Sequence, residues 1–566
     1  MPSLTIDGQE ISVADGTTVI QAAEELGIYI PRYCYHPALS VAGNCRICLV
    51  EIEKSPKLQV ACNTPVSEGM VVHTKSETAE SGRKAVLEFL LANHPLDCPV
   101  CDQAGECDLQ NFYMNFGLYD PRFREHKVKK KKAVELGPHV MLDQERCILC
   151  SRCVRFTDEI TGTGEFGIFN RGDRAELGLY PGDVLDNPYS ANVVDICPVG
   201  ALTESDFRFK ARVWYLSSAR TVCNGCSQGC NIDLHYVLDR PHLNDGARVL
   251  RIKPRYNGDV NQWWLCDAGR FGFGWVDQQR LTQVRGPRPQ DGDDADNTSN
   301  ATATESSEQP MPVATWPQAI STLGAALTTQ TIQTDGSRVG VIASAQLTCE
   351  ELFLIRKLFC EKLGAQVTVS VPEEPGDSDD FLIQSDKNPN TLGTQLLGLA
   401  GADAPEAAQL IEQGLDGALD VLWVFGHDLV QLFGAEKVQA LCRQVPLVVY
   451  SGTNENPMVD LADWVLPTAA YVEKDGTFVN CHGRVQRIGR AFPALEESRE
   501  DWRLLIELGQ ELGQTWDWTK PQQVFTALAA EVACFADLSY ESIGWLGAEA
   551  ASAEAAAGTA EGASAS

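Results

Sequence analysis

The placement of cysteine constrains this chain more than any other feature. Of its 20 cysteines, 15 lie within the first 266 of 566 residues. In a reducing compartment, clustered cysteines are more often metal ligands than disulfide partners. Fifteen is also an odd number, so disulfide pairing alone would leave one thiol over. We therefore expect the first half of the chain to be organised around metal sites.

Charge and hydropathy exclude several classes of protein. The chain carries 46 Lys and Arg against 77 Asp and Glu, a formal net charge of −31. Such a surface repels phosphate backbones and argues against a nucleic-acid partner. Apolar runs such as 86–92 and 421–425 are far shorter than the roughly 18 residues that a membrane-spanning helix needs. The first residues also lack the basic and apolar regions of a signal peptide. These features predict a soluble, cytoplasmic protein.

The first group of cysteines has the spacing C-x10-C-x2-C-x13-C. Its members are Cys34, Cys45, Cys48 and Cys62. The small residues at 42–44 allow backbone N–H groups to approach sulfur, and plant-type ferredoxins hold two-iron clusters with a comparable, tighter loop. A structural zinc site is the alternative, but zinc usually prefers two short C-x2-C pairs and this group has one. The spacing therefore favours a [2Fe–2S] cluster.

The second group contains too few cysteines for a four-coordinate site. Cys98, Cys101 and Cys107 leave the site one ligand short. His94 is the nearest candidate donor, and imidazole can replace thiolate on iron. The alternative is that His94 only caps the preceding helix and a distant cysteine completes the set. The position of His94 in the sequence does not favour either interpretation over the other.

The third group has the spacing typical of a [4Fe–4S] cluster. Cys147, Cys150 and Cys153 form C-x2-C-x2-C, and Cys197 precedes a proline after 43 intervening residues. No second tight triplet exists with which a ligand could be exchanged. We expect these four cysteines to bind one cluster.

The fourth group consists of Cys223, Cys226, Cys230 and Cys266, spaced C-x2-C-x3-C-x35-C. Zinc is the competitor for this spacing. Four sets need 16 ligands, and 15 cysteines plus His94 supply 16. Five scattered cysteines remain and are expected to be buried structural thiols: Cys349, Cys360, Cys442, Cys481 and Cys534.

Local patterns predict α+β structure first and α/β structure later. Asp7-Gly8 between two apolar runs predicts a hairpin. Thr18 with Gln21 forms a capping-box pattern that opens a helix, and Gly27 suits its end. A second helix is expected over 80–93, and the basic run 127–132 is expected to be a solvated linker. After residue 312, strands alternate with helices, which is typical of a mostly parallel sheet covered on both faces.

Four segments carry a resemblance to a known family. They are AGNCRICLVEIEK at 42–54, NHPLDCPVCDQAGECDLQ at 93–110, RCILCSRCVRF at 146–156 and DICPVGALT at 195–203. Through them the chain resembles the large peripheral-arm iron–sulfur subunits of respiratory complex I, over about 1–283 and less specifically over about 316–515. The resemblance implies a [2Fe–2S] cluster on the first set and a [4Fe–4S] cluster on the second and third. It also assigns His94 as a ligand of the second set.

The later part of the chain is similar to another superfamily. The Cys223–Cys266 segment resembles the [4Fe–4S] domain that opens molybdopterin oxidoreductases, which some bacterial members of the subunit family retain as an extra, off-path cluster. DWVLPTAAYVEKDGTFVNCHGRVQR at 463–487 extends this likeness. The α/β region is shorter than in true molybdoenzymes, and Cys349 lies in a helix-capping turn. We expect one [2Fe–2S] cluster, three [4Fe–4S] clusters and no molybdopterin.

The expected architecture is therefore multidomain, α+β and then α/β. It comprises a β-grasp [2Fe–2S] ferredoxin-like domain, [4Fe–4S] ferredoxin-like domains and a truncated molybdopterin-oxidoreductase-like α/β domain. The expected boundaries are 1–77 ([2Fe–2S] ferredoxin type), 78–117 (His/Cys3 [4Fe–4S]), 135–215 ([4Fe–4S] ferredoxin-like), 218–282 ([4Fe–4S] of molybdopterin-oxidoreductase type), 283–312 (flexible linker), 313–545 (truncated α/β domain) and 546–566 (disordered tail).

The resemblance implies an electron-relay subunit of NADH:quinone oxidoreductase, a translocase, that does not itself bind NADH. Electrons from a flavin- and NADH-binding partner would pass by the [2Fe–2S] cluster and the 147–197 and 94–107 clusters toward quinone-side iron–sulfur subunits. No residue is expected to act as a catalytic acid, base or nucleophile. The complex would place the chain peripherally at the cytoplasmic face of the inner membrane. The alternative is a cluster-bearing subunit of a soluble NAD-linked hydrogenase or formate dehydrogenase complex.

Overall fold

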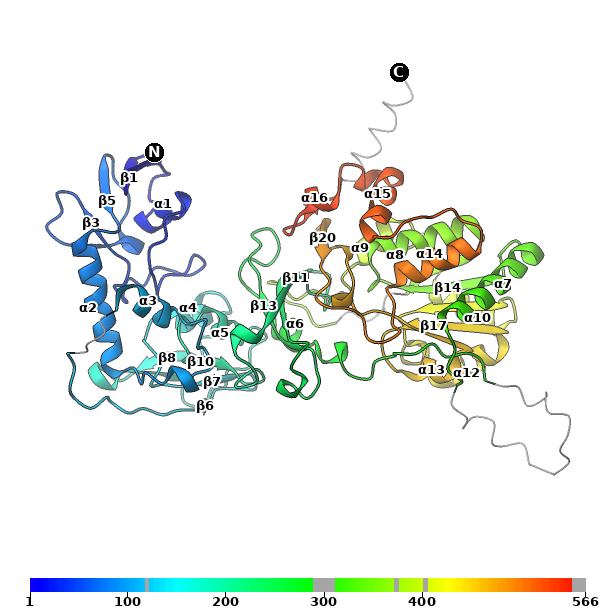
Figure 1. Ribbon diagram of the computed structural model, residues 1–566, viewed down its shortest axis with the longest axis horizontal. Coiled ribbons are helices and arrows are strands. Elements are labelled where there is room, and N and C mark those ends of the chain that lie inside the picture. The colour runs from blue at the N-terminus through cyan, green and yellow to red at the C-terminus, as the bar shows by residue number, and fades with distance from the viewer. Residues whose placement is uncertain (118–121, 289–310, 371–375, 401–405, 552–566) are drawn as a thin grey trace, which may run out of the picture. The chain divides into compact units, whose positions relative to one another are not determined.

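Residues 1–117, 122–288, 311–370, 376–400 and 406–551 are described by the computed structural model (Figure 1). The chain divides into a first unit, Met1–Leu216 with Asp239–Gly246, and a second unit, Ser217–Leu238 with Ala247–Ser566. Most of the linker expected over 283–312 and of the tail expected over 546–566 lies outside the described residues. Within the described part of the chain, no helix is long and apolar enough to cross a bilayer.

A mixed five-stranded sheet opens the first unit, in the order β2-β1-β5-β3-β4. Its strands are β1 (Ser3–Ile6), β2 (Gln9–Ser12), β3 (Leu49–Ile52), β4 (Gln59–Val60) and β5 (Met70–His73). The turn between β1 and β2 has positive φ at Asp7 (47°) and Gly8 (85°), as a tight hairpin requires. Helix α1 (Val19–Glu25) begins where Thr18 N–H donates to Gln21 Oε1 at 2.9 Å. The β-grasp arrangement and both local predictions are confirmed.

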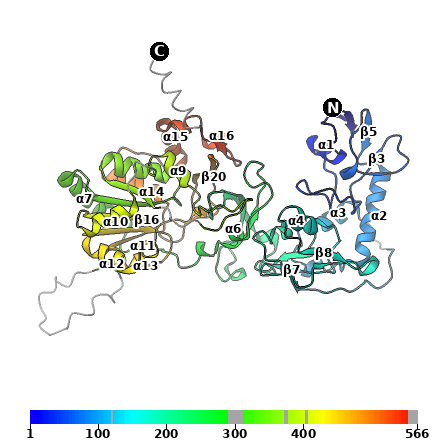
Figure 2. The same cartoon turned by 180° about the vertical axis from the view of Figure 1, so that it is seen from behind.

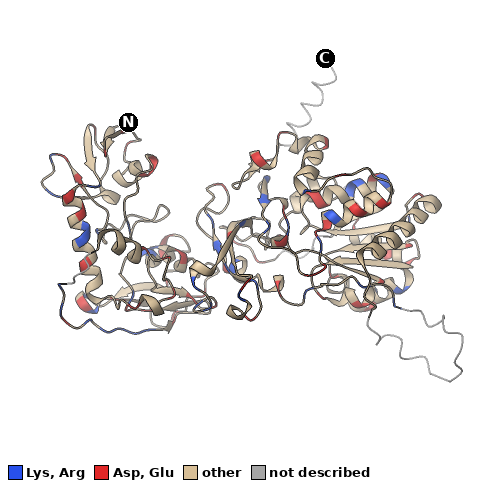
Figure 3. Cartoon of the chain, in the orientation of Figure 1, with Lys and Arg blue, Asp and Glu red and all other residues tan. Residues whose placement is uncertain are grey.

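Two helices follow and flank the second cysteine group. Helix α2 (Glu77–Asn93) begins three residues before the expected start, because Ser76 Oγ accepts from Ala79 N–H at 3.2 Å. It carries both acidic and basic residues along its length (Figure 3). Arg83 is buried and donates from Nη2 to the Leu49 carbonyl at 2.9 Å, which ties α2 to β3. Helix α3 (Asp108–Phe116) packs against α2.

The remainder of the first unit holds short strands and helices. They are β6 (Val134–Glu135), β7 (Val140–Leu142), α4 (Arg152–Glu159), β8 (Phe166–Phe169), β9 (Glu176–Leu179), α5 (Asn192–Ile196) and β10 (Leu202–Glu204). The run 127–132 forms no helix or strand, as expected of a linker, and Lys129, Lys131 and Lys132 are exposed, but the run also contacts its surroundings. Lys127 Nζ donates to the Leu91 carbonyl at 2.7 Å, and Lys132 Nζ lies 3.0 Å from a carboxylate oxygen of Glu145. The basic run therefore anchors to α2 and to the segment before α4.

The second unit contains an antiparallel sheet and a parallel sheet. The antiparallel sheet is β11 (Ser217–Val222), β12 (Asn231–Tyr236) and β13 (Val249–Pro254), followed by α6 (Asp267–Phe271). The parallel sheet has the order β15-β14-β16-β17-β18. Its strands are β14 (Val339–Ser344), β15 (Gln366–Ser370), β16 (Val421–Phe425), β17 (Leu447–Gly452) and β18 (Trp464–Pro467).

Helices cover both faces of the parallel sheet (Figure 2). One side holds α7 (Trp316–Thr334), α8 (Cys349–Ile355), α14 (Asp501–Glu511) and α15 (Pro521–Glu531). The other side holds α10 (Ala407–Leu415), α11 (Leu429–Phe433), α12 (Ala435–Gln444) and α13 (Pro457–Leu461). An apolar core lies on each side of the sheet, and alternate residues of β16 pack into the two cores. Trp423 and Phe425 pack into the first core, and Leu422 and Val424 pack into the second. The predicted α/β region is confirmed.

A smaller sheet completes the second unit. Helix α9 (Thr391–Leu396) packs on β19 (Gly476–Val479), which pairs with β20 (Arg484–Ile488), and β20 pairs with β21 (Ala548–Glu549). Helix α16 (Tyr540–Ile543) lies against β20. The described ends of the expected linker are also packed: Val284 is fully buried, and Gly286 N–H donates to the Pro312 carbonyl at 2.9 Å.

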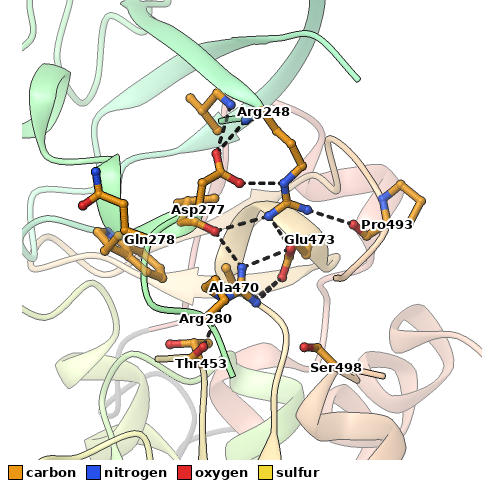
Figure 4. Close-up of polar contacts among 12 residues, drawn as sticks. Arg248, Asp277, Gln278, Arg280, Thr453, Ala470, Glu473, Pro493 and Ser498 are labelled. Carbon is orange, nitrogen blue, oxygen red and sulfur yellow. Dashed lines mark hydrogen bonds and ion pairs between the residues drawn. The ribbon is translucent and has the colours of Figure 1, made fainter. Parts of the chain in front are cut away.

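A buried ionic network joins the β11–β13 segment to the parallel-sheet region (Figure 4). Arg248 follows β12 in the chain and pairs with Asp277 at 2.6 Å and with Glu473 at 2.7 Å. Arg280 donates to both oxygens of Glu473, at 2.8 and 3.1 Å. Two cations thus share one carboxylate whose side chain is 0 % exposed. The network fixes the fourth cysteine group to the α/β sheet within the second unit.

Candidate metal centres

The first cysteine set converges in the interior of the N-terminal domain. Cys34, Cys48 and Cys62 are buried and Cys45 is half-buried. Cys34 N–H donates to Cys45 Sγ at 3.4 Å. Hydrogen bonds from the Cys45 and Cys62 thiols hold the pKa of Cys34 below its usual value. The backbone N–H of Asn44 also donates to this sulfur, next to Gly43, whose φ is +60°. Cys48 and Cys62 also hydrogen-bond to each other, so the structure brings the four sulfurs together with backbone donors beside them.

The second set surrounds the end of α2 and the start of α3. His94 ends α2 in an extended conformation, and Cys107 is the residue at which α3 begins. His94, Cys98 and Cys107 line one cavity of about 480 Å³. Burial lowers the pKa of His94 to about 4, so its imidazole is neutral at pH 7 and keeps a lone pair for a metal. Cys101 lies one turn after Cys98, and its N–H donates to the Cys98 carbonyl at 3.1 Å.

The third set occupies a tight loop before α4 and the end of α5. Leu149 and Ser151 adopt positive φ of 54° and 62°, which brings the C-x2-C-x2-C sulfurs to one side. Leu149 N–H donates to Cys147 Sγ at 3.4 Å. Burial, and next the negative charge of Cys197, raise the pKa of Cys150 to about 11. Buried thiols with raised pKa values bind as thiolates only when a cation compensates their charge.

The fourth set lies in the second unit. Gly225 N–H donates to Cys223 Sγ at 3.4 Å, and Gly269 N–H donates to Cys266 Sγ at 3.3 Å. A Cβ on Gly269 would lie 3.0 Å from the sulfur of Cys223 and 3.4 Å from that of Cys266. Glycine at this position lets the two sulfurs approach the same backbone.

The second and third sets adjoin each other in the first unit. Gly200 follows Cys197, and a Cβ added to it would lie 2.3 Å from Cys101 Sγ. Asp108 N–H donates to the Pro198 carbonyl at 3.0 Å. The first three sets also share one apolar core, in which Cys34, Cys107 and Cys150 are buried and Cys45, Cys147 and Cys197 pack against it.

The donor chemistry fits iron–sulfur clusters. Peptide N–H groups point at the sulfurs of Cys45, Cys147, Cys223 and Cys266. Such donors stabilise negative charge on sulfur and tune cluster potentials. The hydroxyl of Tyr33 is buried in the shared core with no hydrogen-bond partner among the described residues. In the described ranges, no three His, Cys, Asp or Glu side chains are arranged to hold a single metal ion.

The five later cysteines do not form a further set. Cys349 and Cys534 are buried and Cys360 and Cys442 are half-buried, but Cys481 is exposed. The prediction of a buried thiol is therefore wrong for Cys481. It lies on the turn between β19 and β20, where its N–H donates to the Ser227 carbonyl at 2.8 Å. The loop of the fourth set thus packs on this turn, a contact that apolar neighbours in the sequence do not reveal.

Models of five protein families match the chain. Residues 2–77 match a 2Fe-2S iron-sulfur cluster binding domain, 83–122 the NADH-ubiquinone oxidoreductase-G iron-sulfur binding region, and 137–203 the ferredoxin-like domain of NADH-quinone oxidoreductase subunit 3. Residues 216–278 match the Fe4S4 domain of molybdopterin oxidoreductase, and 400–511 match molybdopterin oxidoreductase itself. Domains that bind [2Fe–2S] and [4Fe–4S] clusters are therefore present, together with a molybdopterin-oxidoreductase-like domain.

Known proteins give the same family. The 78 kDa subunit of mitochondrial NADH-ubiquinone oxidoreductase from Candida albicans is 32% identical over 90% of this chain and 82% of its own length. The G-type subunit of NADH-quinone oxidoreductase from Rickettsia bellii is 45% identical over 50% of this chain and 40% of its own. The crystal structure of an NAD+-reducing [NiFe]-hydrogenase matches with 33% identity over 38% of this chain and 91% of that chain, at a TM-score of 0.34. The chain therefore belongs to the family of the 75/78 kDa, or G-type, subunit of NADH–quinone oxidoreductase, and is an electron-transfer iron–sulfur subunit of that oxidoreductase complex.

Proposed function

We propose that sixteen residues of this chain hold one [2Fe–2S] and three [4Fe–4S] clusters. The [2Fe–2S] ligands are Cys34, Cys45, Cys48 and Cys62. The [4Fe–4S] ligands are His94, Cys98, Cys101 and Cys107; Cys147, Cys150, Cys153 and Cys197; and Cys223, Cys226, Cys230 and Cys266. The count of 15 cysteines and one histidine supports four complete sets.

The shared apolar core of the first three sets is the observation that carries this proposal. Electron transfer through a protein needs closely spaced redox centres in a medium of low dielectric constant. This core packs sulfurs of all three sets together. Gly200 lets a sulfur of the second set approach the backbone that follows Cys197 of the third. Arg155 Nη2 donates to the carbonyls of Cys34, at 2.5 Å, and Cys150, at 3.4 Å, and so links the first and third sets.

The proposed partners are a flavin- and NADH-binding subunit on one side and quinone-side iron–sulfur subunits on the other. When bound, such clusters accept and release single electrons, and we place the first set nearest the flavin, then the third and the second. The fourth set belongs to the other unit. We propose that it does not take part in this order of electron transfer. Within the complex, the chain would sit peripherally at the cytoplasmic face of the inner membrane.

The α/β domain is proposed to act without molybdopterin. A cavity of about 360 Å³ lies at the carboxyl ends of the parallel strands, where ligands of such sheets usually bind. Its lining includes Ser344, Ser451 and Lys474, and no cysteine, histidine or methionine from the described residues. Cys349 is fully buried, with its thiol 3.5 Å from Asn390 Oδ1. These residues do not supply a soft ligand for molybdenum.

Metal analysis tests the cluster count. Anaerobically purified protein should contain about 14 iron atoms per chain, from 2 + 4 + 4 + 4. Stoichiometric zinc with little iron would reject the proposal.

The ligand role of His94 has a separate test. His94→Ala should change the low-temperature electron paramagnetic resonance signal of one [4Fe–4S] cluster and leave the [2Fe–2S] signal intact. His73→Ala is the matched control, because His73 is part-exposed and pairs with Glu53 at 3.0 Å. Unchanged spectra in His94→Ala would remove it from the ligand set.

A further inference from the structure

Tyr33 brings a buried hydroxyl into the core that the first three cysteine sets share. The side chain is 0 % exposed. Its hydroxyl oxygen has no hydrogen-bond partner among the described residues. Buried hydroxyls in folded proteins nearly always have a partner, so an unpartnered one points to an acceptor outside the polypeptide. The acceptor must be buried here and electron-rich.

Two contacts fix where the hydroxyl lies. Its ring packs on Phe112 of α3, with centroids 5.1 Å apart, and α3 begins at Cys107. The backbone next to it is held on both sides, because Cys34 N–H donates to Cys45 Sγ and the Cys34 carbonyl accepts from Arg155. Tyr33 therefore stands between a [2Fe–2S] ligand loop and the helix that starts at a ligand of the second set, with little freedom to move away.

The packing of Tyr33 points to the second set. Cys107 is buried in the same apolar core as Tyr33. Phe112, on which the Tyr33 ring packs, lies on the helix that begins at Cys107.

We propose that the Tyr33 hydroxyl donates a hydrogen bond to a sulfur atom of the cluster held by His94, Cys98, Cys101 and Cys107. Tyr33 is then a positioning and tuning residue of that cluster. A donor to sulfur stabilises the reduced form, which carries one more negative charge, and so raises the reduction potential. The inference rests on the proposed ligand set, and it adds a residue that the spacing of cysteines does not identify.

Redox titration of the whole complex, followed by electron paramagnetic resonance, tests the proposal. Tyr33→Phe removes only the hydroxyl and keeps the ring on Phe112. It should lower the equilibrium constant for one-electron reduction of this cluster about tenfold, which is 59 mV. Electron–nuclear double resonance should show that an exchangeable-proton coupling at this cluster, present in the wild type, is lost in the variant.

Tyr29→Phe is the matched control. Tyr29 packs on the same Phe112 ring, at 6.3 Å, but is 60% exposed. Its substitution should leave the potential and the proton coupling unchanged. An unaltered potential in Tyr33→Phe, or an equal shift in Tyr29→Phe, would overturn the proposal. Iron content separates failure of this proposal from failure of the proposed ligand sets. A normal iron content without a change in potential refutes the role of Tyr33, whereas a chain without iron refutes the ligand sets.

Discussion

Arg155 donates its Nη2 to the carbonyl oxygen of Cys34 at 2.5 Å, across 121 residues of sequence. Arg155 is 9% exposed, and its guanidinium also lies within hydrogen-bond reach of the Cys150 carbonyl. One buried cation thus serves ligand loops of two cysteine sets. Because positive charge stabilises a reduced cluster, this arginine should raise the reduction potentials of the clusters on the first and third sets.

Arg155→Met should lower the potentials of the clusters on the first and third sets. A unit charge about 10 Å away, in a medium of effective dielectric constant about 20, contributes on the order of 1–2 kcal/mol. Arg155→Lys retains the charge and should retain most of the potential, although it loses the forked hydrogen bonding. Potentials measured by redox titration check this, and equal values in wild type and Arg155→Met would contradict it.

Glu473→Gln should destabilise the second unit by about 3–5 kcal/mol. The change leaves Arg248 and Arg280 buried beside a neutral amide. Glu455→Gln is the control, since its partner Arg285 is 29% exposed and Glu455 itself 40%, and such pairs contribute only about 0–1 kcal/mol. Urea unfolding followed by tryptophan fluorescence compares the two variants. Equal midpoints would show that the ionic network does not stabilise the second unit.

Glu350 should make the stability of the second unit depend on pH. Its carboxyl is fully buried, and accepts from Tyr540 Oη at 2.8 Å and Thr477 N–H at 2.9 Å. Burial raises its pKa from 4.5 to about 7. The folded state therefore holds a proton that the unfolded state loses above pH 4.5, and stability falls as pH rises from about 4.5 to about 7.

Glu350→Gln should remove this part of the pH dependence. The rise of the Glu350 pKa from 4.5 to about 7 corresponds to a loss of on the order of 3 kcal/mol of stability between these pH values. Unfolding midpoints at pH 4.5, 5.5, 6.5 and 7.5 measure it in both proteins. A slope that is the same in wild type and variant would assign the dependence to other groups, such as Asp501, whose pKa burial also raises to about 7.

Much of this structure follows from local signals. The Asp7-Gly8 hairpin, the Thr18–Gln21 capping box and the four cysteine groups depend on neighbours within a few residues or on metal-ligand spacing. Contacts between distant segments could not be predicted in this way. Lys127 reaches the end of α2, and the turn that carries the exposed Cys481 packs on the loop of the fourth set. The isolation of Tyr33 from polar partners is likewise a property of packing.

Loss of the fourth cluster should leave the other three intact. Cys266 lies in the second unit, whereas the remaining sets lie in the first. Cys266→Ala should therefore reduce iron to about 10 atoms per chain, from 2 + 4 + 4, and preserve the [2Fe–2S] signal. Cys481→Ala should keep the full count, because Cys481 belongs to no set. Loss of iron from all sets in Cys266→Ala would show that the sets fold interdependently.

Gly200→Ala should disturb the second set without changing any ligand. The added methyl group would lie 2.3 Å from Cys101 Sγ, a distance that requires the sulfur or the backbone to shift. We expect lower occupancy or an altered resonance of the His94 cluster, with the [2Fe–2S] signal unchanged. Gly178→Ala is the control, because its methyl group would meet Phe169 at an ordinary 3.5 Å. Iron analysis and electron paramagnetic resonance measure both variants, and a normal resonance in Gly200→Ala would mean that Cys101 is not held where the second set needs it.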